Sequence, residues 1–230
     1  IVNASEESRA VIGLNKKTGA EVWKAPGDKL ELSYTTPFVF NASPEKQLII
    51  VPVPNEIWAI NPENGKLVWF AETSLNGNIS PTIAAKDTLL FCFGGFPQTK
   101  SVALKAEGKG DLSKNIVWSS TDSSYVPSPV VKGEHLYWIN DRGLAYCAEA
   151  ATGKIIYKER LPLKSSGGAA RPVYASMILV HDKLIAVTRQ EGTFVLDASP
   201  TFKLISHNKI SDENDFNASP AISEGKLFLR

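Results

Sequence analysis

Several residue types and patterns are scarce in this chain of 230 residues, and each scarcity excludes a class of protein. The 2 cysteines and 3 histidines show neither C-x-x-C nor H-x-x-x-H spacing, which argues against a structural zinc site. The 25 basic and 24 acidic residues give a net charge of +1 without any charge block, so a nucleic-acid footprint and an electrostatic membrane patch are not expected. No apolar run approaches the ~20 residues of a membrane-spanning helix. We therefore expect a chain that binds no nucleic acid and does not span a membrane.

The two cysteines stand in strand-like segments that are far apart in the sequence. Cys92 lies in LLFCFGG and Cys147 in LAYCAEA. We interpret both as small buried hydrophobic residues in different structural units, and a long-range disulfide between them is the alternative.

A phrase of eleven residues recurs along the chain. It reads GLNKKTGAEVW from Gly13, AINPENGKLVW from Ala59 and CAEAATGKIIY from Cys147. Each copy opens on a small residue, continues through a turn that contains glycine, and closes on an aromatic residue four positions beyond that glycine. The glycine permits positive φ, and an asparagine such as Asn15 or Asn61 can bond the amides of the turn. We interpret the phrase as two strands joined by a tight turn, and as structural rather than as a cofactor site.

A second pattern, a proline followed by an apolar run, recurs out of phase with the first. Its copies are about 45 residues apart and begin at Pro37, Pro81, Pro129, Pro172 and Pro220. In the copy at Pro129, Gly-, Asn- and Asp-containing turns separate four short apolar strands. No window of a dozen residues shows an uninterrupted helical period, so almost no helix is expected. Four short antiparallel strands per repeat are typical of a propeller blade.

The repeats predict an all-β fold, a β-propeller of four-stranded antiparallel blades that forms a single domain over residues 1–230. The expected parts are a half-blade at 1–25, blades at about 34–71, 78–120, 125–160 and 169–208, and a half-blade at 216–230. The two half-blades are complementary and would close a five-bladed ring. Alternatively, the chain is part of a larger propeller of about seven to eight blades. The stop in the middle of a blade favours the larger propeller, because an open ring leaves unpaired strand edges.

The pattern A-x-D/N-x-x-T/N-G-K-x-x-W resembles the tryptophan-docking repeat of the PQQ-like (quinoprotein) β-propeller family. The copy from Ala59 to Trp69 matches it almost position by position, whereas the first copy has Ala20 in place of the lysine and the last copy ends on Tyr157. The resemblance covers essentially the whole chain. The family includes quinoprotein alcohol dehydrogenases and also a non-catalytic, BamB-like branch. The segments GTFVLDASP and FNASPAISEGKLFLR resemble secreted PQQ-like repeat proteins of planctomycete-type bacteria.

The resemblance implies a packing role for the aromatic residues that close the repeats. In this family each ring docks between neighbouring blades, and the residues concerned here are Trp23, Trp69, Trp118 and Tyr157. A tryptophan or tyrosine buries ~150–250 Å², so it can join two sheets that share no backbone hydrogen bonds. We expect Trp69 and Trp118 to be largely buried between blades.

The cofactor chemistry of the family is not matched by this sequence. Its alcohol dehydrogenases hold PQQ and Ca²⁺, clamp the quinone with adjacent disulfide-bonded cysteines and a tryptophan floor, and use an aspartate base. This chain has no Cys-Cys pair, and none of its acidic residues stands in a motif that matches the family's calcium ligand or base. Missing blades of a larger parent could carry those groups. The sequence favours a protein that is not an enzyme, without catalytic residues, metal, PQQ or calcium. A PQQ-dependent alcohol or sugar dehydrogenase is the alternative.

Candidate ligand-binding residues lie on the turns and inter-blade connections, which share one face of a propeller. The fourth blade has Arg171 where other blades have Thr or Ser before the proline. The set predicted to bind a ligand is Asp141, Arg142, Arg171, Arg189 and Glu191. Its guanidinium groups would hold an anion or a carboxylate bidentately. The competing interpretation is that these arginines are solvated or form internal salt bridges.

A third class of function, carbohydrate or cell-surface binding, is suggested by aromatic residues near the inter-blade connections. Their rings would stack on sugars, although packing at strand edges explains them equally well; the residues are Tyr34, Phe96, Tyr125 and Tyr174.

The function hypothesis is a non-catalytic, extracytoplasmic propeller that binds or scaffolds a protein, as in the BamB-like branch that serves outer-membrane assembly. Its expected partner is a protein or another cell-envelope component, and its expected location is the periplasm or another extracytoplasmic compartment. The chain starts at Ile1 without a signal peptide, which indicates a processed or truncated start. A lipid anchor on the missing N-terminus is part of this hypothesis.

Overall fold

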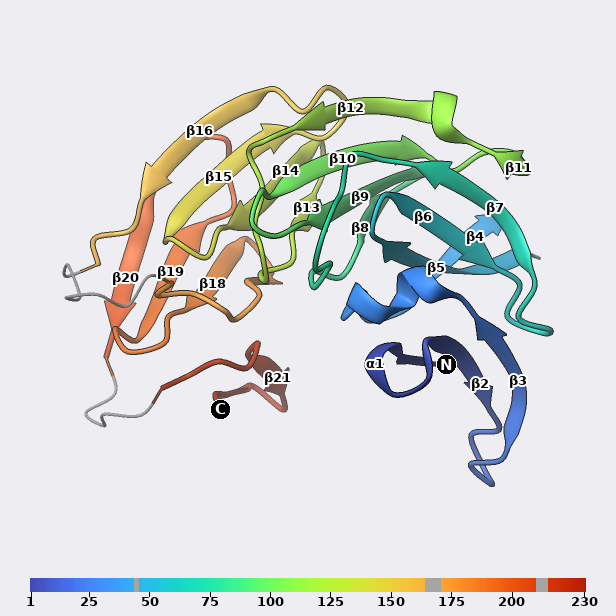
Figure 1. Ribbon diagram of the computed structural model, residues 1–230. Coiled ribbons are helices and arrows are strands. Elements are labelled where there is room, and N and C mark those ends of the chain that lie inside the picture. The colour runs from blue at the N-terminus through green and yellow to red at the C-terminus, as the bar shows by residue number, and fades with distance from the viewer. Residues whose placement is uncertain (44–45, 164–170, 210–214) are drawn as a thin grey trace. The chain divides into compact units, whose positions relative to one another are not determined.

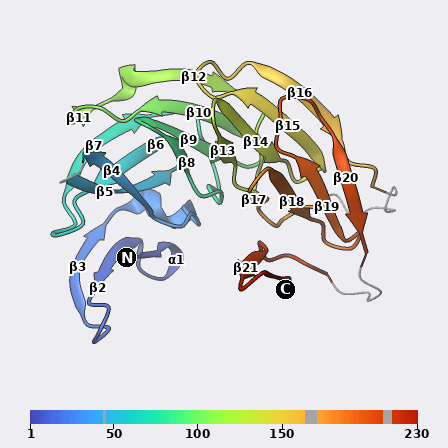
Figure 2. The same ribbon diagram turned by 180° about the vertical axis from the view of Figure 1, so that it is seen from behind.

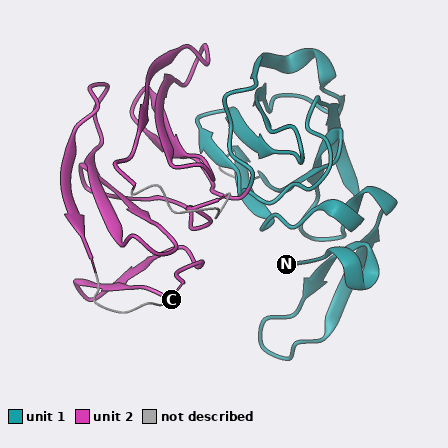
Figure 3. Cartoon of the chain, turned by 60° about the vertical axis from the view of Figure 1, so that its left-hand side comes forward, with its two compact units in different colours: residues 1–125 teal, residues 126–230 magenta. Residues whose placement is uncertain are grey.

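The computed structural model describes residues 1–43, 46–163, 171–209 and 215–230. The chain divides into two compact units, unit 1 from Ile1 to Tyr125 and unit 2 from Val126 to Arg230. Figure 3 shows the two units in different colours. The organisation of the whole chain as one domain stays a prediction.

Unit 1 begins with a three-stranded antiparallel sheet where the sequence predicted two strands. Its order is β1 (Val2–Ala4), β2 (Ala10–Leu14) and β3 (Glu21–Pro26). The short helix α1 (Ser5–Ser8) joins β1 to β2, and the 3-10 helix η1 (Asp28–Leu32) follows β3. The additional strand β1 has only three residues, too few to show an alternating pattern.

The rest of unit 1 consists of two antiparallel sheets and an inserted segment. The first sheet contains β4 (Phe38–Ser43), β5 (Lys46–Val53), β6 (Glu56–Ile60) and β7 (Leu67–Glu72). The second contains β8 (Ala84–Lys86), β9 (Leu89–Gly94), β10 (Lys100–Lys105) and β12 (Ile116–Ser120). The insertion between β10 and β12 forms β11 (Gly110–Asp111) and the 3-10 helix η2 (Ser113–Asn115). Because β11 pairs in parallel with β7, it adds a fifth strand to the preceding sheet (Figure 1).

Unit 2 contains two four-stranded antiparallel sheets and a hairpin. The sheets are β13 (Val130–Lys132), β14 (His135–Ile139), β15 (Leu144–Glu149) and β16 (Ile155–Arg160), then β17 (Ile178–Val180), β18 (Lys183–Val187), β19 (Thr193–Asp197) and β20 (Leu204–Asn208). The hairpin is β21 (Ala221–Ser223) and β22 (Lys226–Phe228). The neighbouring strands β18, β19 and β20 are visible from both sides in Figures 1 and 2. The predicted all-β fold with four-stranded antiparallel sheets and almost no helix is confirmed.

The recurring phrase forms the two last strands of a sheet, and its register explains its composition. The opening residue lies directly opposite the closing aromatic residue, as in the pairs Gly13–Trp23 and Ala59–Trp69, and a β-bulge follows at once. A Cβ atom on Gly13 would lie 2.4 Å from the Trp23 ring, so this position accepts only a very small residue. In the last sheet, where Ser206 replaces the aromatic residue, the larger Val195 stands opposite it.

The turn inside the phrase uses the predicted asparagine and glycine. The Asn15 side-chain oxygen accepts hydrogen bonds from the amides of Lys17 (2.9 Å) and Thr18 (3.1 Å). Gly65 adopts a φ of +70°, a region that strongly favours glycine. In the second copy, the Asn61 side-chain oxygen likewise accepts a hydrogen bond from the Glu63 amide (2.8 Å), and this turn meets the Trp23 ring of the preceding sheet.

Sheets within each unit pack face to face through alternating residues. One face of the β4–β7 sheet, with Ile50 and Ala59, packs on β9 and β10. Its other face, with Val51 and Ile60, packs on β2, β3 and η1. In unit 2, residues of β14 to β16 pack in the same way on β18 and β19. Inner strands such as β5, β9 and β14 are therefore buried on both faces, which explains their nearly continuous apolar runs.

Candidate functional site

The candidate ligand-binding residues lie on the loops of unit 2, and we call this group of five residues the unit 2 rim. The turn between β14 and β15 is held by the Asn140 side chain, whose oxygen accepts hydrogen bonds from the amides of Arg142 and Leu144, both at 3.0 Å. This turn buries Asp141, which is 8% exposed, and leaves Arg142 exposed. Asparagine in this position stabilises the turn by mimicking a backbone contact.

Arg171 and Asp141 of the unit 2 rim are brought together. The Nε of Arg171 lies 3.4 Å from Oδ2 of Asp141, and the two side chains are 26% and 11% exposed. The amide of Val173 also donates to the main-chain oxygen of Asp141, at 3.3 Å. The sequence-based alternative of an internal salt bridge therefore describes this pair.

Arg189 of the rim also pairs with a carboxylate of its own unit. Its Nε donates to Oδ1 of Asp215 at 2.8 Å, and its Nη2 donates to Oδ2. The guanidinium carbon lies 5.1 Å from the centre of the Tyr174 ring. The hydrogen bonds from Arg189 lower the pKa of Asp215, and the same contacts raise the pKa of Arg189. Sequence reasoning missed Asp215, because no local pattern links residues that are 26 positions apart.

The remaining rim residue, Glu191, acts through its main chain in the turn between β18 and β19. Its amide donates to the Thr188 hydroxyl at 3.0 Å, and its main-chain oxygen bonds the His207 ring. The His207 ring stacks on Phe194 with centroids 4.0 Å apart. The rim is thus a set of charged side chains on ordered turns, and its role in ligand binding stays a prediction.

A second region, in unit 1, presents apolar side chains on loops that are joined by backbone hydrogen bonds. The amide of Tyr34 donates to the oxygen of Ile79 at 2.8 Å, and the amide of Ile79 donates to the oxygen of Leu32 at 2.9 Å. The turn between β9 and β10 joins the same segment, because the Phe96 amide donates to the oxygen of Asn76 at 3.1 Å. These bonds hold three segments of chain in one arrangement.

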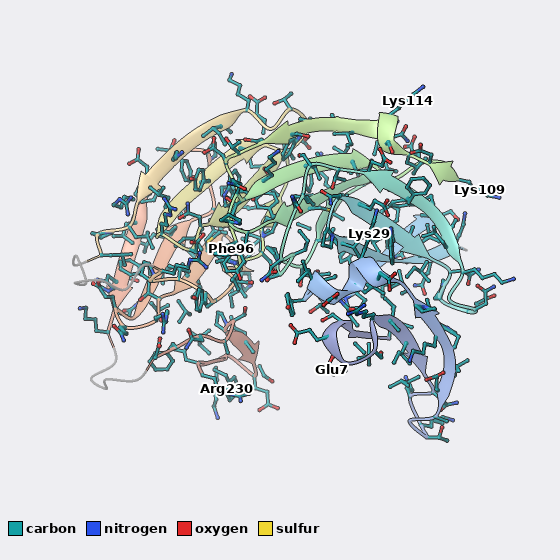
Figure 4. All side chains as sticks on the ribbon, viewed as in Figure 1. Glu7, Lys29, Phe96, Lys109, Lys114 and Arg230 are labelled. Carbon is teal, nitrogen blue, oxygen red and sulfur yellow. The ribbon has the colours of Figure 1, made fainter. Side chains whose placement is uncertain are left out.

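Large apolar and aromatic side chains in this region are exposed to solvent. Leu32 is 38% exposed, and Tyr34 and Phe96 are each 43% exposed. The Phe96 and Tyr125 rings lie 5.0 Å apart at an angle of 39°. We call Leu32, Tyr34, Phe96 and Tyr125 the unit 1 loop surface; Phe96 is labelled in Figure 4. Three of these four residues were singled out from the sequence as candidates for stacking on a sugar.

A pocket that sequence reasoning missed lies along β3, and we call it the β3 pocket. It has a volume of about 310 Å³. Its wall combines apolar side chains with two lysines and is formed by Lys24 and Ala25 of β3, Trp58 and Ile60 of β6, and Lys66 and Leu67 after the turn. The lining residues come from two sheets, so no single stretch of sequence signals it.

The closing aromatic residues contact the next sheet within each unit. The Trp23 Nε1 donates to the oxygen of Pro62 at 2.8 Å, and its ring covers Gly65 closely enough that a Cβ atom there would lie 2.6 Å away. The Tyr157 ring packs edge-on against Phe202 with centroids 5.5 Å apart. In both contacts, an aromatic residue in the last strand of one sheet packs against the turn between the last two strands of the following sheet.

The other two closing residues differ in burial. Trp69 is 1% exposed, as expected, and its Nε1 has no hydrogen-bond partner among the described residues. Trp118 is partly buried, as Trp23 is. Its ring stacks on Phe91 of its own sheet, with centroids 6.0 Å apart, which covers one face of the ring. Docking of Trp118 between blades stays a prediction.

The cysteines do not supply the quinone clamp of the family's dehydrogenases. Cys92 in β9 and Cys147 in β15 are both free and buried, and they belong to different sheets. Burial raises the pKa of both thiols, that of Cys147 to about 11. The cysteines of this chain therefore do not fit the disulfide that holds PQQ.

The described residues contain no group of three or more His, Cys, Asp or Glu side chains placed to hold a metal ion. None of their helices is long and apolar enough to cross a bilayer.

Known proteins with the same architecture are distant in sequence. The crystal structure of BamB from Moraxella catarrhalis superposes with a TM-score of 0.71 at 13% identity, covering 97% of this chain and 64% of that chain. The computationally designed Ika8 protein gives a TM-score of 0.69 at 11% identity, covering 98% of this chain and 63% of the other. Quinohemoprotein alcohol dehydrogenase from Comamonas testosteroni gives 0.64 at 13% identity, covering 89% and 41%. The chain thus spans less than two thirds of the length of each structure, and these likenesses show the fold.

No curated protein is significantly similar to this chain. The family model described as outer membrane protein assembly factor BamB matches residues 1–159, which is more than half of the chain. Together with the docked aromatic residues and the four-stranded sheets, this match shows that the chain belongs to the PQQ-like repeat β-propeller family of the outer membrane protein assembly factor BamB.

Proposed function

We propose that this protein is a non-catalytic, extracytoplasmic propeller module that binds and scaffolds a protein of the cell envelope. Membership of the BamB family supports an envelope role, and the periplasm is the compartment that this role implies. The proposed partner is a folded protein that contacts the loops.

The observation that carries this proposal is the unit 1 loop surface. Leu32 at the end of η1, and Tyr34 and Phe96 on the loops, expose between 38% and 43% of their surface, and backbone hydrogen bonds already hold these segments in place. Exposed aromatic residues are enriched at protein–protein interfaces, and a preformed surface avoids the entropic cost of ordering loops on binding. The loops therefore have the composition and the order that a protein-binding surface needs.

The unit 2 rim is proposed as a polar contact region for the same class of partner. Arg142 is exposed and forms no side-chain hydrogen bond or ion pair within the described part of the chain. Arg171 and Arg189 are already paired with Asp141 and Asp215, so a partner would meet oriented guanidinium–carboxylate pairs rather than isolated cations. Such pairs favour specificity over affinity.

The proposal is tested by photo-crosslinking in the native host. A photoreactive phenylalanine analogue replaces Tyr34 or Phe96, and a matched control carries it at Val117, which is 47% exposed on the outer strand β12. We expect one envelope protein to crosslink from the loop positions and not from Val117. The purified partner should then bind the Phe96→Ala variant at least about tenfold more weakly, the loss of one well-placed aromatic contact. Equal crosslinking from all three positions would overturn the proposal.

The competing function is PQQ-dependent oxidation of an alcohol or a sugar. The similar fold of the Comamonas testosteroni enzyme is the reason to test it. The protein is titrated with PQQ and calcium, and dye-linked oxidation of a panel of alcohols and sugars is followed. We expect no turnover above that of a heat-denatured sample. Oxidation that depends on added PQQ would replace the proposal with the enzyme.

Sugar binding is the second competing function, because the exposed rings of Tyr34 and Phe96 suit stacking on pyranose faces. Cosedimentation with purified peptidoglycan separates the two hypotheses. We expect the protein to stay in the supernatant. Cosedimentation that is lost in Phe96→Ala would assign the loop surface to sugars instead.

A further inference from the structure

The β3 pocket lies beside the last strand of the first sheet. In the next repeat, the equivalent space beside β7 is filled by a segment of the same chain. The repeats align through the pairs formed by a small residue and its aromatic partner, Gly13–Trp23, Ala59–Trp69 and Ala103–Trp118. In this alignment, β3 corresponds to β7, and β6 corresponds to β10. The space beside β3 can therefore be compared directly with the space beside β7.

Beside β7, the insertion supplies a strand and a buried side chain. Asp111 of β11 pairs with Phe70, and the amide of Leu112 donates to the oxygen of Phe70 at 2.8 Å. Leu112 is 5% exposed and belongs to the same apolar cluster as Ala71 and Leu104. The outer edge of β7 is thus covered by a short parallel strand whose leucine is buried.

Beside β3, the corresponding space is open. No described strand pairs with the outer edge of β3, and the residues that correspond to Ala71 and Leu104 are Ala25 and Ile60. Both of these residues line the β3 pocket, whose volume of about 310 Å³ exceeds what one leucine side chain needs. The pocket is therefore an unfilled equivalent of the site that Leu112 occupies.

The wall of the pocket is held in place before any ligand binds. Trp58 donates from Nε1 to Oε2 of Glu56 at 2.6 Å. The other end of its indole covers Gly27, where a Cβ atom would lie 2.6 Å from the ring. Glu56 is itself bonded to Lys29. A side chain entering the pocket would meet a fixed aromatic surface.

The charge beside the pocket differs from that beside β7. Lys24 stands where Phe70 stands in β7, so a strand added in the same register would place its acidic residue opposite Lys24. Lys24 and Lys66 are both exposed, and neither forms an ion pair with any described residue. A segment with an acidic residue next to an apolar one, as in Asp111-Leu112, would complement an apolar pocket flanked by two lysines.

We propose that β3 binds an extended segment of a partner protein, which adds a short parallel strand, places an apolar side chain in the β3 pocket and sets an acidic side chain opposite Lys24. This inference rests on the proposed protein-binding function and assigns it a second contact site with a defined ligand chemistry. Main-chain pairing supplies part of the affinity, and the pocket supplies specificity.

One residue limits the length of the added strand. In the filled site, the amide of Glu72 donates to the Ser113 hydroxyl at 2.9 Å. Its counterpart on β3 is Pro26, which has no amide hydrogen. Pairing with β3 therefore ends at this residue, and the recognised segment is short, like the two-residue β11.

The inference is tested with a peptide that copies residues 107–115, EGKGDLSKN, labelled at its N-terminus. Fluorescence anisotropy with the intact protein should show saturable binding. A peptide with the leucine replaced by asparagine should bind about tenfold more weakly or not at all, because the asparagine amide would be buried in an apolar pocket. Replacing the peptide's aspartate by lysine should weaken binding in low salt, and the difference should shrink as salt screens it.

Protein variants locate the binding site. Lys24→Glu combined with Lys66→Glu should weaken binding of the peptide about tenfold in low salt. Lys16→Glu combined with Lys17→Glu makes the same change in net charge on exposed residues of the neighbouring turn, and should leave binding within about twofold of the unmodified protein. Equal weakening by both pairs, or equal affinity for the leucine and asparagine peptides, would overturn the inference.

The outcome is independent of the test of the proposed function. If the peptide fails to bind while loop positions still crosslink a partner, the β3 site is wrong and the scaffolding function stands. If the peptide binds the β3 pocket and the loop positions crosslink nothing, the β3 site stands and the loop-centred function is wrong.

Discussion

The indole Nε1 of Trp23 donates a hydrogen bond of 2.8 Å to the carbonyl oxygen of Pro62, which lies 39 residues further along the chain. Trp23 belongs to the last strand of one sheet, and Pro62 belongs to the tight turn of the next sheet. The same turn presents Gly65 to the indole ring. One repeat therefore supplies the aromatic residue and the following repeat supplies the surface that receives it.

Replacing Gly65 with alanine measures this contact. The new Cβ atom would lie 2.6 Å from the Trp23 ring, and the φ of +70° strains any other residue. The matched control is Gly19→Ala, because Gly19 has nearly the same φ of +73° and no atom near the added methyl group. Gly19→Ala should cost about 1 kcal/mol, and Gly65→Ala should cost about 1–3 kcal/mol more in urea unfolding. Equal losses would show that the indole moves away freely.

Replacing Trp69 with alanine should reduce the free energy of unfolding by about 3–5 kcal/mol, as for other buried aromatic residues. Trp69→Phe should cost less than about 2 kcal/mol, because it keeps an aromatic ring and removes a buried N–H that has no described acceptor. Val22→Ala, at a side chain that is 62% exposed, serves as the control and should change stability by less than about 0.5 kcal/mol. A loss below about 1 kcal/mol in Trp69→Ala would contradict its burial between sheets.

The Arg189–Asp215 pair should make stability depend on pH in the acid range. Hydrogen bonds from Arg189 lower the pKa of Asp215 in the folded protein, whereas an unfolded aspartate titrates near about 3.9. The stabilisation is therefore fully present above about pH 4 and is lost as the pH falls through the lowered folded-state value. The stability difference between the natural protein and Asp215→Asn should shrink between about pH 6 and pH 2.

The matched control is the same Asp215→Asn change in an Arg189→Gln background, which lacks the guanidinium that bonds Asp215. In that background the stability difference should depend less on pH, because the main cause of the lowered Asp215 pKa is gone. Because both partners of the Arg189–Asp215 pair are partly exposed to solvent, the whole effect should not exceed about 1 kcal/mol. A pH-independent difference for Asp215→Asn would contradict the assigned pKa shift.

The two thiols should be unreactive in the folded protein. Burial raises the pKa of Cys92, and burial raises the pKa of Cys147 to about 11, so neither forms appreciable thiolate near neutral pH. A colorimetric disulfide reagent at about pH 8 should label neither thiol in the native protein and both thiols after denaturation. Rapid labelling without denaturant would show that one of the two strands opens easily.

Much of the fold could be predicted because the repeats combine two periodic signals. Alternation within strands and glycine at fixed turn positions are local properties, and they located the four-stranded sheets of both units. The three-residue strand β1 and the pairing of β11 with β7 escaped prediction, because very short strands carry no pattern of their own.

The candidate site was less predictable than the fold. The sequence singled out Asp141, Arg171 and Arg189, but it did not show that Arg171 pairs with Asp141. It missed Asp215, the partner of Arg189, altogether. The β3 pocket could not be predicted from the sequence either, because its lining residues, such as Lys24 and Trp58, belong to different sheets. Side-chain pairing across segments depends on the packing of sheets, which local patterns do not specify.

The sequence by itself determined the all-β repeat, the turn chemistry of Asn15 and Gly65, and the membership of the PQQ-like family. Each of these depends on residues within about a dozen positions of one another, where strand period and turn geometry act. Only the tertiary structure decided that Arg189 is bound to Asp215 and that the space beside β3 is open while the space beside β7 is filled. These outcomes depend on which side chains of neighbouring sheets meet, and that is settled by packing over distances that no sequence window spans.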